Sequence, residues 1–434
     1  MLKQLWGRQI PVVNPEIYGN QVMQRPAIYR HRQHYYCNRC GQRISKQDCL
    51  PQQNYYCRHC LSLGRVSTLD TLISIPEPNR FPKLNHNPLL WSGQLSPLQK
   101  QCSRELLTVV KNGGHHLLWA VTGAGKTEML FETLAYALQK QMRIGLASPR
   151  VDVCTELYPR IKEAFTVKPL LLHGKSEISY SYCQLTICTT HQLLRFYQAF
   201  DLLIIDEVDS FPFAQDAGLA YAAQNACKAK GSLVYLTATP GKELQKQVAR
   251  RNLSVSYLPL RFHGYLLPEI QVIKTRRREL LPAKALTYLK KWFQAGTPFL
   301  IFVPKIVDLA PVLKKVKQTL PNLAVASVHA ADEQRLEKVI ALRSGKLQAL
   351  VTTTILERGV TFKNLDLMVL AAEQTFSSAA LVQIAGRVGR SAQKPGGEVL
   401  FFCQRKNAAI REAQRQIKFM NRKGAQLGGK MYSV

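Results

Sequence analysis

The chain has 434 residues, with 59 Lys and Arg against 28 Asp and Glu and a net charge of +31. Its composition is that of a globular protein, and no apolar run approaches the ~18–20 residues that span a bilayer, so secreted and membrane-spanning proteins are not expected. The positive charge, concentrated in residues 263–434, predicts a polyanionic partner, most naturally nucleic acid; a basic protein without a specific partner is the alternative.

Residues 1–85 carry two cysteine pairs in the pattern CxxC, sixteen residues, CxxC. Four thiolates in two knuckles are typical of a tetrahedral structural zinc site, and Gly41 permits a tight turn after the first knuckle. The predicted ligands are Cys37, Cys40, Cys57 and Cys60. His59 is expected to face solvent, and Pro76–Pro88 is interpreted as a linker.

Arginines and tyrosines alternate through the same segment. They are expected either to grip a nucleic-acid backbone and stack bases or to form a solvated basic surface. The arginines concerned are Arg30, Arg32, Arg39, Arg43 and Arg58. Because the segment has few apolar runs, zinc is expected to supply much of its folding energy, independently of the core of the segment that follows.

Residues 86–262 alternate between strand and helix signals, which predicts a parallel sheet with crossover helices. The predicted strands are 116–121, 144–148, 169–172, 185–188, 202–205 and 233–237, with a helix at 127–140. After a break at 258–283 the alternation restarts in residues 263–434. The expected strands there are 298–303, 323–328, 348–352, 367–371 and 397–403, and the expected helices are 307–319, 332–345, 377–385 and a basic tail at 405–423. The fold class is therefore α/β, with two α/β domains behind a small cysteine-bearing module.

A phosphate-binding loop is predicted where the first strand meets its helix. Its residues are Gly123, Ala124, Gly125, Lys126 and Thr127. Glycines allow backbone N–H groups to surround phosphates, the lysine neutralises the β- and γ-phosphates, and the threonine binds Mg²⁺. The pattern is imperfect, because Ala120 replaces the usual first glycine.

An acidic run follows the strand that ends near residue 205. Asp206 is the expected Mg²⁺ partner, and Glu207 is the candidate base that orients the attacking water. A helix start enriched in acidic residues is the competing interpretation, which the phosphate loop about 80 residues upstream disfavours.

With these motifs in order, the chain resembles the superfamily 2 helicases and translocases, which have two RecA-like domains. Leu95–Gln99 is similar to the adenine-sensing motif, GAGKT to motif I, Ser148-Pro149-Arg150 to motif Ia, DEVD to motif II, Thr237-Ala238-Thr239 to motif III, Thr352–Thr361 to motif V and Gln383–Arg390 to motif VI. DEVD in place of DEAD favours DNA-acting relatives. Relatives also carry an acidic ribose contact where this chain has Val360-Thr361.

The resemblance implies roles for further residues. Arg387 and Arg390, three apart and expected on one helical face, would stabilise the phosphoryl charge on domain closure, with Gln383 positioning phosphate or water. Gln99 and Gly359 would contact ATP. The implied DNA contacts are Pro149, Arg150, Thr189, Thr190, Lys305, Thr352 and Thr353.

Across nearly its whole length the chain resembles the ComFA family of late-competence proteins of Gram-positive bacteria. The resemblance is carried by SPRVDVC, TTHQLL, DEVDSFPF, TTTILERGVTF and IKFMNRKG. It implies a cytoplasmic ATPase at the inner membrane face that pulls single-stranded DNA through the uptake channel, together with other late-competence proteins and without a transmembrane segment. ATP, Mg²⁺ and one structural Zn²⁺ are the implied cofactors.

The expected domains are a zinc-binding module at 1–85, a first RecA-like domain at 86–262 and a second at 263–434. A PriA-type replication-restart helicase is the second candidate, but its cysteines are more numerous and lie between motor segments. A DNA-binding scaffold with a degenerate motor is the third, and the intact motif residues disfavour it.

Overall fold

The computed structural model of the chain describes residues 2–174, 180–276, 279–357 and 362–431. Its contacts divide it into two compact units. The first comprises Met1–Trp119 with Lys126–Tyr257, and the second comprises Ala120–Gly125 with Leu258–Val434. Each unit contains one parallel α/β sheet, which confirms the predicted fold class of two RecA-like domains in tandem behind a small cysteine-bearing module.

The first unit is built on a seven-stranded sheet in the order β10-β11-β9-β12-β13-β8-β14, in which the strands from β10 to β8 pair in parallel. The strands are β8 (His116–Ala120), β9 (Ile144–Ser148), β10 (Leu170–Leu172), β11 (Leu185–Thr189), β12 (Phe200–Asp206), β13 (Cys227–Thr237) and β14 (Ser254–Leu258). All six predicted strands are confirmed, whereas β14 was not anticipated.

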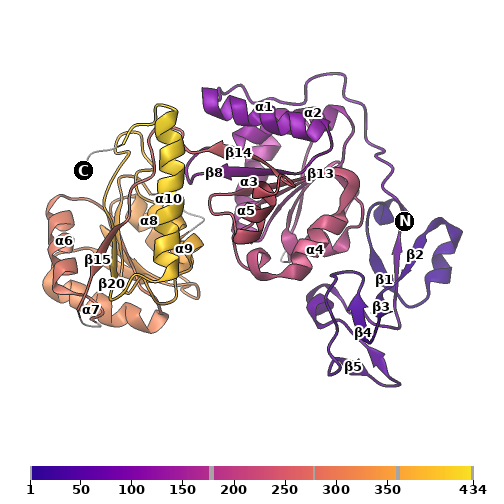
Figure 1. The fold of residues 1–434 in the computed structure, drawn as a ribbon, viewed down its shortest axis with the longest axis horizontal. Coiled ribbons are helices and arrows are strands. Elements are labelled where there is room, and N and C mark those ends of the chain that lie inside the picture. Colours follow the sequence, from indigo (N-terminus) through magenta and orange to yellow (C-terminus); the bar gives the residue numbers. More distant parts are fainter. Residues whose placement is uncertain (1, 175–179, 277–278, 358–361, 432–434) are drawn as a thin grey trace. The chain divides into compact units, whose positions relative to one another are not determined.

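Helices flank this sheet (Figure 1). They are α1 (Pro97–Lys111), α2 (Phe131–Gln139), α3 (Val151–Ala164), α4 (Ala217–Ala226) and α5 (Lys242–Ala249), with 3-10 turns η4 (Glu128–Leu130), η5 (Thr190–Arg195) and η6 (Phe213–Gln215). The helix predicted at 127–140 therefore begins as a 3-10 turn. Helix α1 starts at a reciprocal cap, because the Ser96 hydroxyl accepts from the Gln99 amide and the Gln99 side chain accepts from the Ser96 amide.

The N-terminal segment forms small antiparallel sheets. Strands β1 (Ile10–Val12), β7 (Thr71–Ser74) and β2 (Met23–Pro26) pair in that order, and two hairpins join β3 (Ile28–His31) to β4 (His34–Cys37) and β5 (Cys49–Leu50) to β6 (Asn54–Tyr55). The 3-10 segments are η1 (Leu2–Leu5), η2 (Pro15–Gln21) and η3 (Arg58–Leu63).

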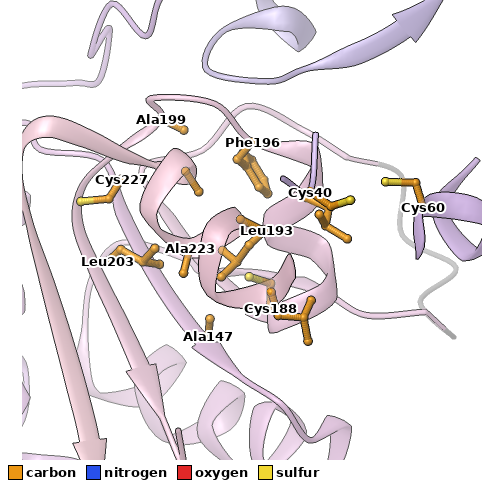
Figure 2. Close-up of a cluster of buried hydrophobic side chains, with 14 of the residues drawn as sticks. Cys40, Cys60, Ala147, Cys188, Leu193, Phe196, Ala199, Leu203, Ala223 and Cys227 are labelled. Atoms are coloured by element: carbon orange, nitrogen blue, oxygen red, sulfur yellow. The ribbon is translucent and has the colours of Figure 1, made fainter. Parts of the chain in front are cut away.

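The four-cysteine segment and the seven-stranded sheet share one apolar core. Figure 2 shows Cys40 and Cys60 in the same cluster as Leu193 and Phe196 of the η5 region and Ala223 of α4. The expectation that the cysteine segment and the ATP-binding segment have independent cores is therefore wrong. A short, apolar-poor segment completes its burial against a neighbour that already has a large core.

The second unit contains a six-stranded parallel sheet in the order β15-β20-β19-β16-β18-β17. Its strands are β15 (Gln271–Lys274), β16 (Phe299–Phe302), β17 (Val325–Val328), β18 (Ala349–Thr352), β19 (Asp366–Val369) and β20 (Val399–Cys403). The five predicted strands are confirmed. Strand β15 lies inside the segment expected to be a break.

The helices of this unit are α6 (Ala283–Gln294), α7 (Leu309–Thr319), α8 (Arg335–Arg343), α9 (Ser378–Ala385) and α10 (Ala408–Gln426), with 3-10 turns η7 (Ile306–Asp308) and η8 (Thr354–Glu357). The four predicted helices are confirmed. The basic tail helix α10 runs beside α9 (Figure 1) and buries Ile410, Ile417 and Met420, so one face of it belongs to the core.

Candidate functional site

The phosphate loop has the backbone that its glycines predict. Gly123 and Gly125 adopt φ angles of 77° and 71°, in the left-handed region that side chains disfavour. Lys126 follows immediately, and its Nζ donates to Oδ1 of Asp206 at 3.2 Å. Two residues that are 80 positions apart in sequence thus meet at the carboxyl ends of β8 and β12, as the sequence predicted.

The charge of Lys126 is held in place by its surroundings. Burial lowers the pKa of this ammonium group, but the neighbouring carboxylates of Asp206, Glu207 and Asp209 raise it, and the net shift is upward. The lysine therefore stays protonated at neutral pH. It is positioned to meet phosphate charge, with Thr127 next to it in the chain.

Glu207, the candidate base, sits in a constrained turn. Its φ of 55° is in the left-handed region, which is unusual for a residue with a side chain. Its amide donates to Oδ1 of Asp206 at 2.8 Å, and the hydroxyl of Ser210 donates to its Oε2 at 3.2 Å. These bonds hold the carboxylates of Asp206 and Glu207 in a fixed mutual arrangement.

Asp209 connects motif II to motif III. Its Oδ1 accepts from the hydroxyl of Thr237 at 2.6 Å, and its Oδ2 accepts from the hydroxyl of Thr239. The resemblance assigned Thr237 and Thr239 to motif III but gave no role to Asp209. The fourth letter of DEVD, an acidic residue three positions after Asp206, was the available signal.

Motif VI departs from the predicted geometry. Helix α9 ends at Ala385, and Gly389 has a φ of 70°, so Arg387 and Arg390 lie in a turn and not on one helical face. A turn follows because glycines at 386 and 389 interrupt the helix. Arg387 is buried and donates from Nε to the carbonyl of Glu357 at 3.1 Å.

Sequence reasoning missed Arg261, which fixes this turn. Its buried guanidinium donates to the carbonyls of Val388 and Gly389, and burial, reinforced by Arg390, lowers its pKa to about 9. The only sequence signal was an arginine in the segment interpreted as a break.

Gln383 is buried in α9, four residues before Arg387.

The residues predicted to contact DNA lie at or just after the carboxyl ends of parallel strands. Pro149 and Arg150 follow β9, Thr190 follows β11 where Thr189 is the last residue, Lys305 follows β16, and Thr353 follows β18 where Thr352 is last. Lys305 is exposed, Thr189, Thr190 and Thr352 are buried, and Arg150 pairs with Asp152. Gly359 and the Val360-Thr361 substitution lie outside the described residues.

The four predicted zinc ligands converge. Their Sγ atoms all lie within 4.8 Å of one another; Cys37 and Cys60 are 3.8 Å apart, and Cys40 and Cys57 are 3.4 Å apart. A zinc ion with bonds of about 2.3 Å separates tetrahedral thiolates by about 3.8 Å, so the cluster has the size that zinc requires. Hydrogen bonds, first those with Cys37, lower the pKa of Cys57 and raise the pKa of Cys60, so the four thiols are tightly coupled.

Some residues around the cluster are buried and have structural roles, whereas others are exposed to solvent. Gly41 has a φ of 70°, as its turn requires, and His59 is exposed, as predicted. Arg39, expected on an exposed basic surface whether or not that surface binds nucleic acid, is 2% exposed and donates from Nε to the carbonyl of Leu194 at 2.9 Å. That prediction was wrong for Arg39, because its guanidinium joins the module to the sheet domain.

Three family models match the chain: Competence protein ComFA N-terminal domain at residues 1–74, Type III restriction enzyme, res subunit at 92–242, and Helicase conserved C-terminal domain at 283–392. Competence protein ComFA of Streptococcus pneumoniae is 41% identical over 92% of this chain and 93% of its own, and that of Bacillus subtilis is 39% identical over 92% and 89%. Among solved structures, S. cerevisiae Dbp5 bound to RNA and ADP BeF3 superposes with a TM-score of 0.55 at 17% identity, covering 79% of this chain and 90% of its own. That likeness concerns the fold alone.

Proposed function

The chain belongs to the ComFA family of competence proteins, and on that premise we propose that it is a motor that moves along single-stranded DNA and drives its import during natural transformation. Its two helicase domains make it a DNA-dependent ATPase of superfamily 2. The proposal is supported by the similarity to competence proteins over 92% of the chain and by the Lys126–Asp206 pair at the phosphate loop.

ATP and Mg²⁺ fit the residues at the phosphate loop. Lys126 compensates the phosphate charge, Thr127 and Asp206 offer the oxygen ligands that Mg²⁺ prefers, and Glu207 orients water. Bound Mg²⁺ would neutralise charge on the β- and γ-phosphates. Arg387 and Arg390 supply further positive charge to the transferring phosphoryl group, with Gln383 beside them in the sequence motif.

Zinc fits the four-cysteine cluster because four thiols of the right spacing are buried together. Four protein ligands complete a tetrahedron and leave no open position for a water, so the metal would be structural. Its position in the shared core suits a role in holding the module against η5 and α4.

We place the DNA path along the carboxyl edges of the two sheets. Pro149, Arg150, Thr189 and Thr190 stand there in the first unit, and Lys305, Thr352 and Thr353 do so in the second. Among the described residues no helix combines the length and apolarity needed to cross a bilayer. From the family membership we propose that the protein works at the inner membrane face, where it would dock on the uptake channel and other late-competence proteins.

The test is phosphate release with single-stranded DNA, duplex DNA and RNA compared side by side, followed by displacement of streptavidin from the end of a biotinylated single strand. The motor proposal expects single-stranded DNA to stimulate hydrolysis most and streptavidin to be displaced only with ATP. Lys126→Ala serves as the inactive control. Hydrolysis that is indifferent to DNA, or stimulated only by RNA, contradicts the proposal.

A further inference from the structure

Four arginines gather where the N-terminal segment meets the first sheet domain. They are Arg8, Arg39, Arg143 and Arg195. The positive charges of the other three lie close enough to Arg8 to lower its pKa. Among the residues that the structure describes, only Arg143 has a carboxylate partner, Glu77. Three guanidinium groups therefore share a partly buried region without compensating negative charge, which is electrostatically costly.

Arg8 and Arg195 line a pocket of about 190 Å³. His173 and Gly174 border it after β10, Gln192 borders it from η5, and Ser62 of η3 completes the side formed by the cysteine module. Every polar side chain among its lining residues can donate a hydrogen bond, and no carboxylate is included. A lining with two arginines, several further donors and no carboxylate is typical of an anion site.

The two arginines are held in position by their surroundings. The guanidinium of Arg8 stacks 4.2 Å from the ring centroid of Tyr180, and the carbonyl of Arg195 accepts from the amide of Gln9 at 2.9 Å. The Nε atoms of Arg8 and Arg195 are nevertheless buried without a hydrogen-bond partner. Burial lowers the pKa of Arg8, Tyr180 opposes this, and Arg195 lowers it further.

A purely structural role explains Arg39 and Arg143 but not this pair. Arg39 donates to the carbonyls of Leu63 and Leu194, and Arg143 donates to Trp6, Glu77 and Tyr180. Both sets of bonds tie the module to the sheet. For Arg8 the aromatic stack is the one specific side-chain contact found in the described part of the chain, and it leaves the donor edge of the guanidinium unused.

We propose that Arg8 and Arg195 form a binding site for a phosphate group. A guanidinium group can donate two parallel hydrogen bonds to a tetrahedral oxyanion. The pocket volume of about 190 Å³ is large enough for one phosphate group but too small to enclose an attached sugar and base as well. The group is either free inorganic phosphate or one phosphodiester of a nucleic-acid strand whose remaining atoms lie outside the pocket.

The position of the pocket favours a phosphodiester of a nucleic-acid strand over free inorganic phosphate. It lies after the carboxyl ends of β10 and β11, the sheet edge that also carries Arg150 and Thr189. A strand crossing that edge would place one phosphate against the junction of module and motor. This choice of source rests on the proposed function, whereas the phosphate site itself does not.

The experiment measures nucleotide-free binding and thermal unfolding of the full chain, with Lys126→Ala as the parent so that the phosphate loop contributes less. The probes are sodium phosphate against sodium chloride at equal ionic strength, an oligothymidylate of about twelve nucleotides, and its uncharged methylphosphonate analogue. The variants are Arg8→Gln and Arg195→Gln. Arg104→Gln, which removes an exposed arginine of α1, is the matched control.

We expect the parent to be stabilised by phosphate, by the oligothymidylate or by both, but not by the uncharged analogue. Each Gln variant should weaken the binding by about ten- to a hundredfold, while Arg104→Gln matches the parent. In chloride, Arg195→Gln should melt no lower than the parent, because it removes repulsion among arginines. Should either Gln variant fail to fold, Arg195→Lys, which keeps the charge but loses the fork, should show a smaller loss.

Response to phosphate alone supports the free anion as the source, and response to the oligothymidylate alone supports the backbone. Equal affinities in the parent and both Gln variants overturn the site, as does a parent that responds to no phosphate probe. Because these measurements contain no ATP, a failure of the motor proposal leaves them interpretable. Conversely, DNA-stimulated hydrolysis by the wild-type chain, together with unchanged phosphate binding in the Arg8→Gln and Arg195→Gln variants, rejects the site alone.

Discussion

At the scale of single residues, the proposed ATP site combines groups whose side chains restrain one another. Lys126 is paired with Asp206, the amide of Glu207 is bonded to the same carboxylate, and Asp209 accepts from two threonine hydroxyls. Charged hydrogen bonds of this kind are worth roughly 1.5–3 kcal/mol each. A change at one carboxylate is therefore expected to disturb the position of its bonded neighbours as well.

Glu207→Gln should preserve ATP binding and lower the rate of hydrolysis by roughly 10²–10⁴-fold, because the amide keeps the shape of the side chain but cannot act as a base. The measurements are fluorescent-nucleotide binding and single-turnover hydrolysis with single-stranded DNA. Lys126→Ala is the contrasting variant and should lose nucleotide affinity. Wild-type turnover in Glu207→Gln would show that another group orients the water.

Asp209→Asn tests the link between motifs II and III. Asparagine retains one acceptor oxygen, so one hydroxyl bond is lost, and DNA stimulation of hydrolysis should fall while nucleotide binding persists. Combined with Thr237→Val in a double-mutant cycle, the effects should be non-additive by about 0.5–3 kcal/mol. Additive losses would mean that the two side chains act separately.

At the scale of elements, the first cysteine knuckle docks on helix α4. A Cβ built on Gly41 would lie 2.7 Å from ring atoms of Tyr221, and one built on Gly218 would lie 3.2 Å from Gln42 and 3.4 Å from the Cys40 carbonyl. Because α4 follows motif II through η6, the knuckle is packed against the element that leaves the ATP site. Such close backbone approach is possible only with glycine.

Gly41→Ala should therefore lower the stability of the first unit by more than the cost of placing alanine at a positive φ, because the added methyl group also clashes with Tyr221. The matched control is Gly345→Ala, which has a similar φ of 78° but no atom within 4 Å of the added Cβ. The control should cost about 1–2 kcal/mol, and Gly41→Ala should add about 1–3 kcal/mol from overpacking. Denaturant unfolding of both variants measures the difference. Equal costs would show that the knuckle yields to Tyr221 without penalty.

Local patterns in the sequence were sufficient to predict the strands and helices and the repeated cysteine pairs of the metal site. Every strand predicted from an apolar run is present, and the four cysteines meet, since both inferences depend on local spacing. The burial of Arg39, the role of Arg261 and the turn at Arg387 depend on partners 30 to 155 residues away. No local pattern records such partners.

At the scale of the whole molecule, the shared core determines what metal loss does. The cysteine cluster belongs to the same buried set as Phe196, Phe200 and Leu203 of the first unit, whereas the second unit has a core of its own around Trp292 and Phe299. Damage at the cluster should therefore reach the first sheet domain and spare the second unit.

Replacing both Cys57 and Cys60 with Ser should release any bound zinc and lower the melting temperature of the first unit, while amides of the second unit keep their protection in hydrogen exchange. ATP affinity should fall together with that stability. A matched control is Cys49→Ser, since Cys49 is exposed and lies outside the cluster. Retained stoichiometric zinc rejects the ligand assignment, and an unchanged first unit rejects its dependence on the cluster.

The contacts between Gln9 and the carbonyls of Leu194 and Phe196 span 185 and 187 residues of sequence, and they have a consequence for synthesis. At about 5–20 residues per second, the ribosome needs roughly 10–40 s to produce η5 after the N-terminal segment has emerged. During that interval the first residues made have no surface to fold against, and their cysteines are accessible to solvent. Early capture of a metal ion by these thiols would give the nascent segment a local structure before its docking partner exists.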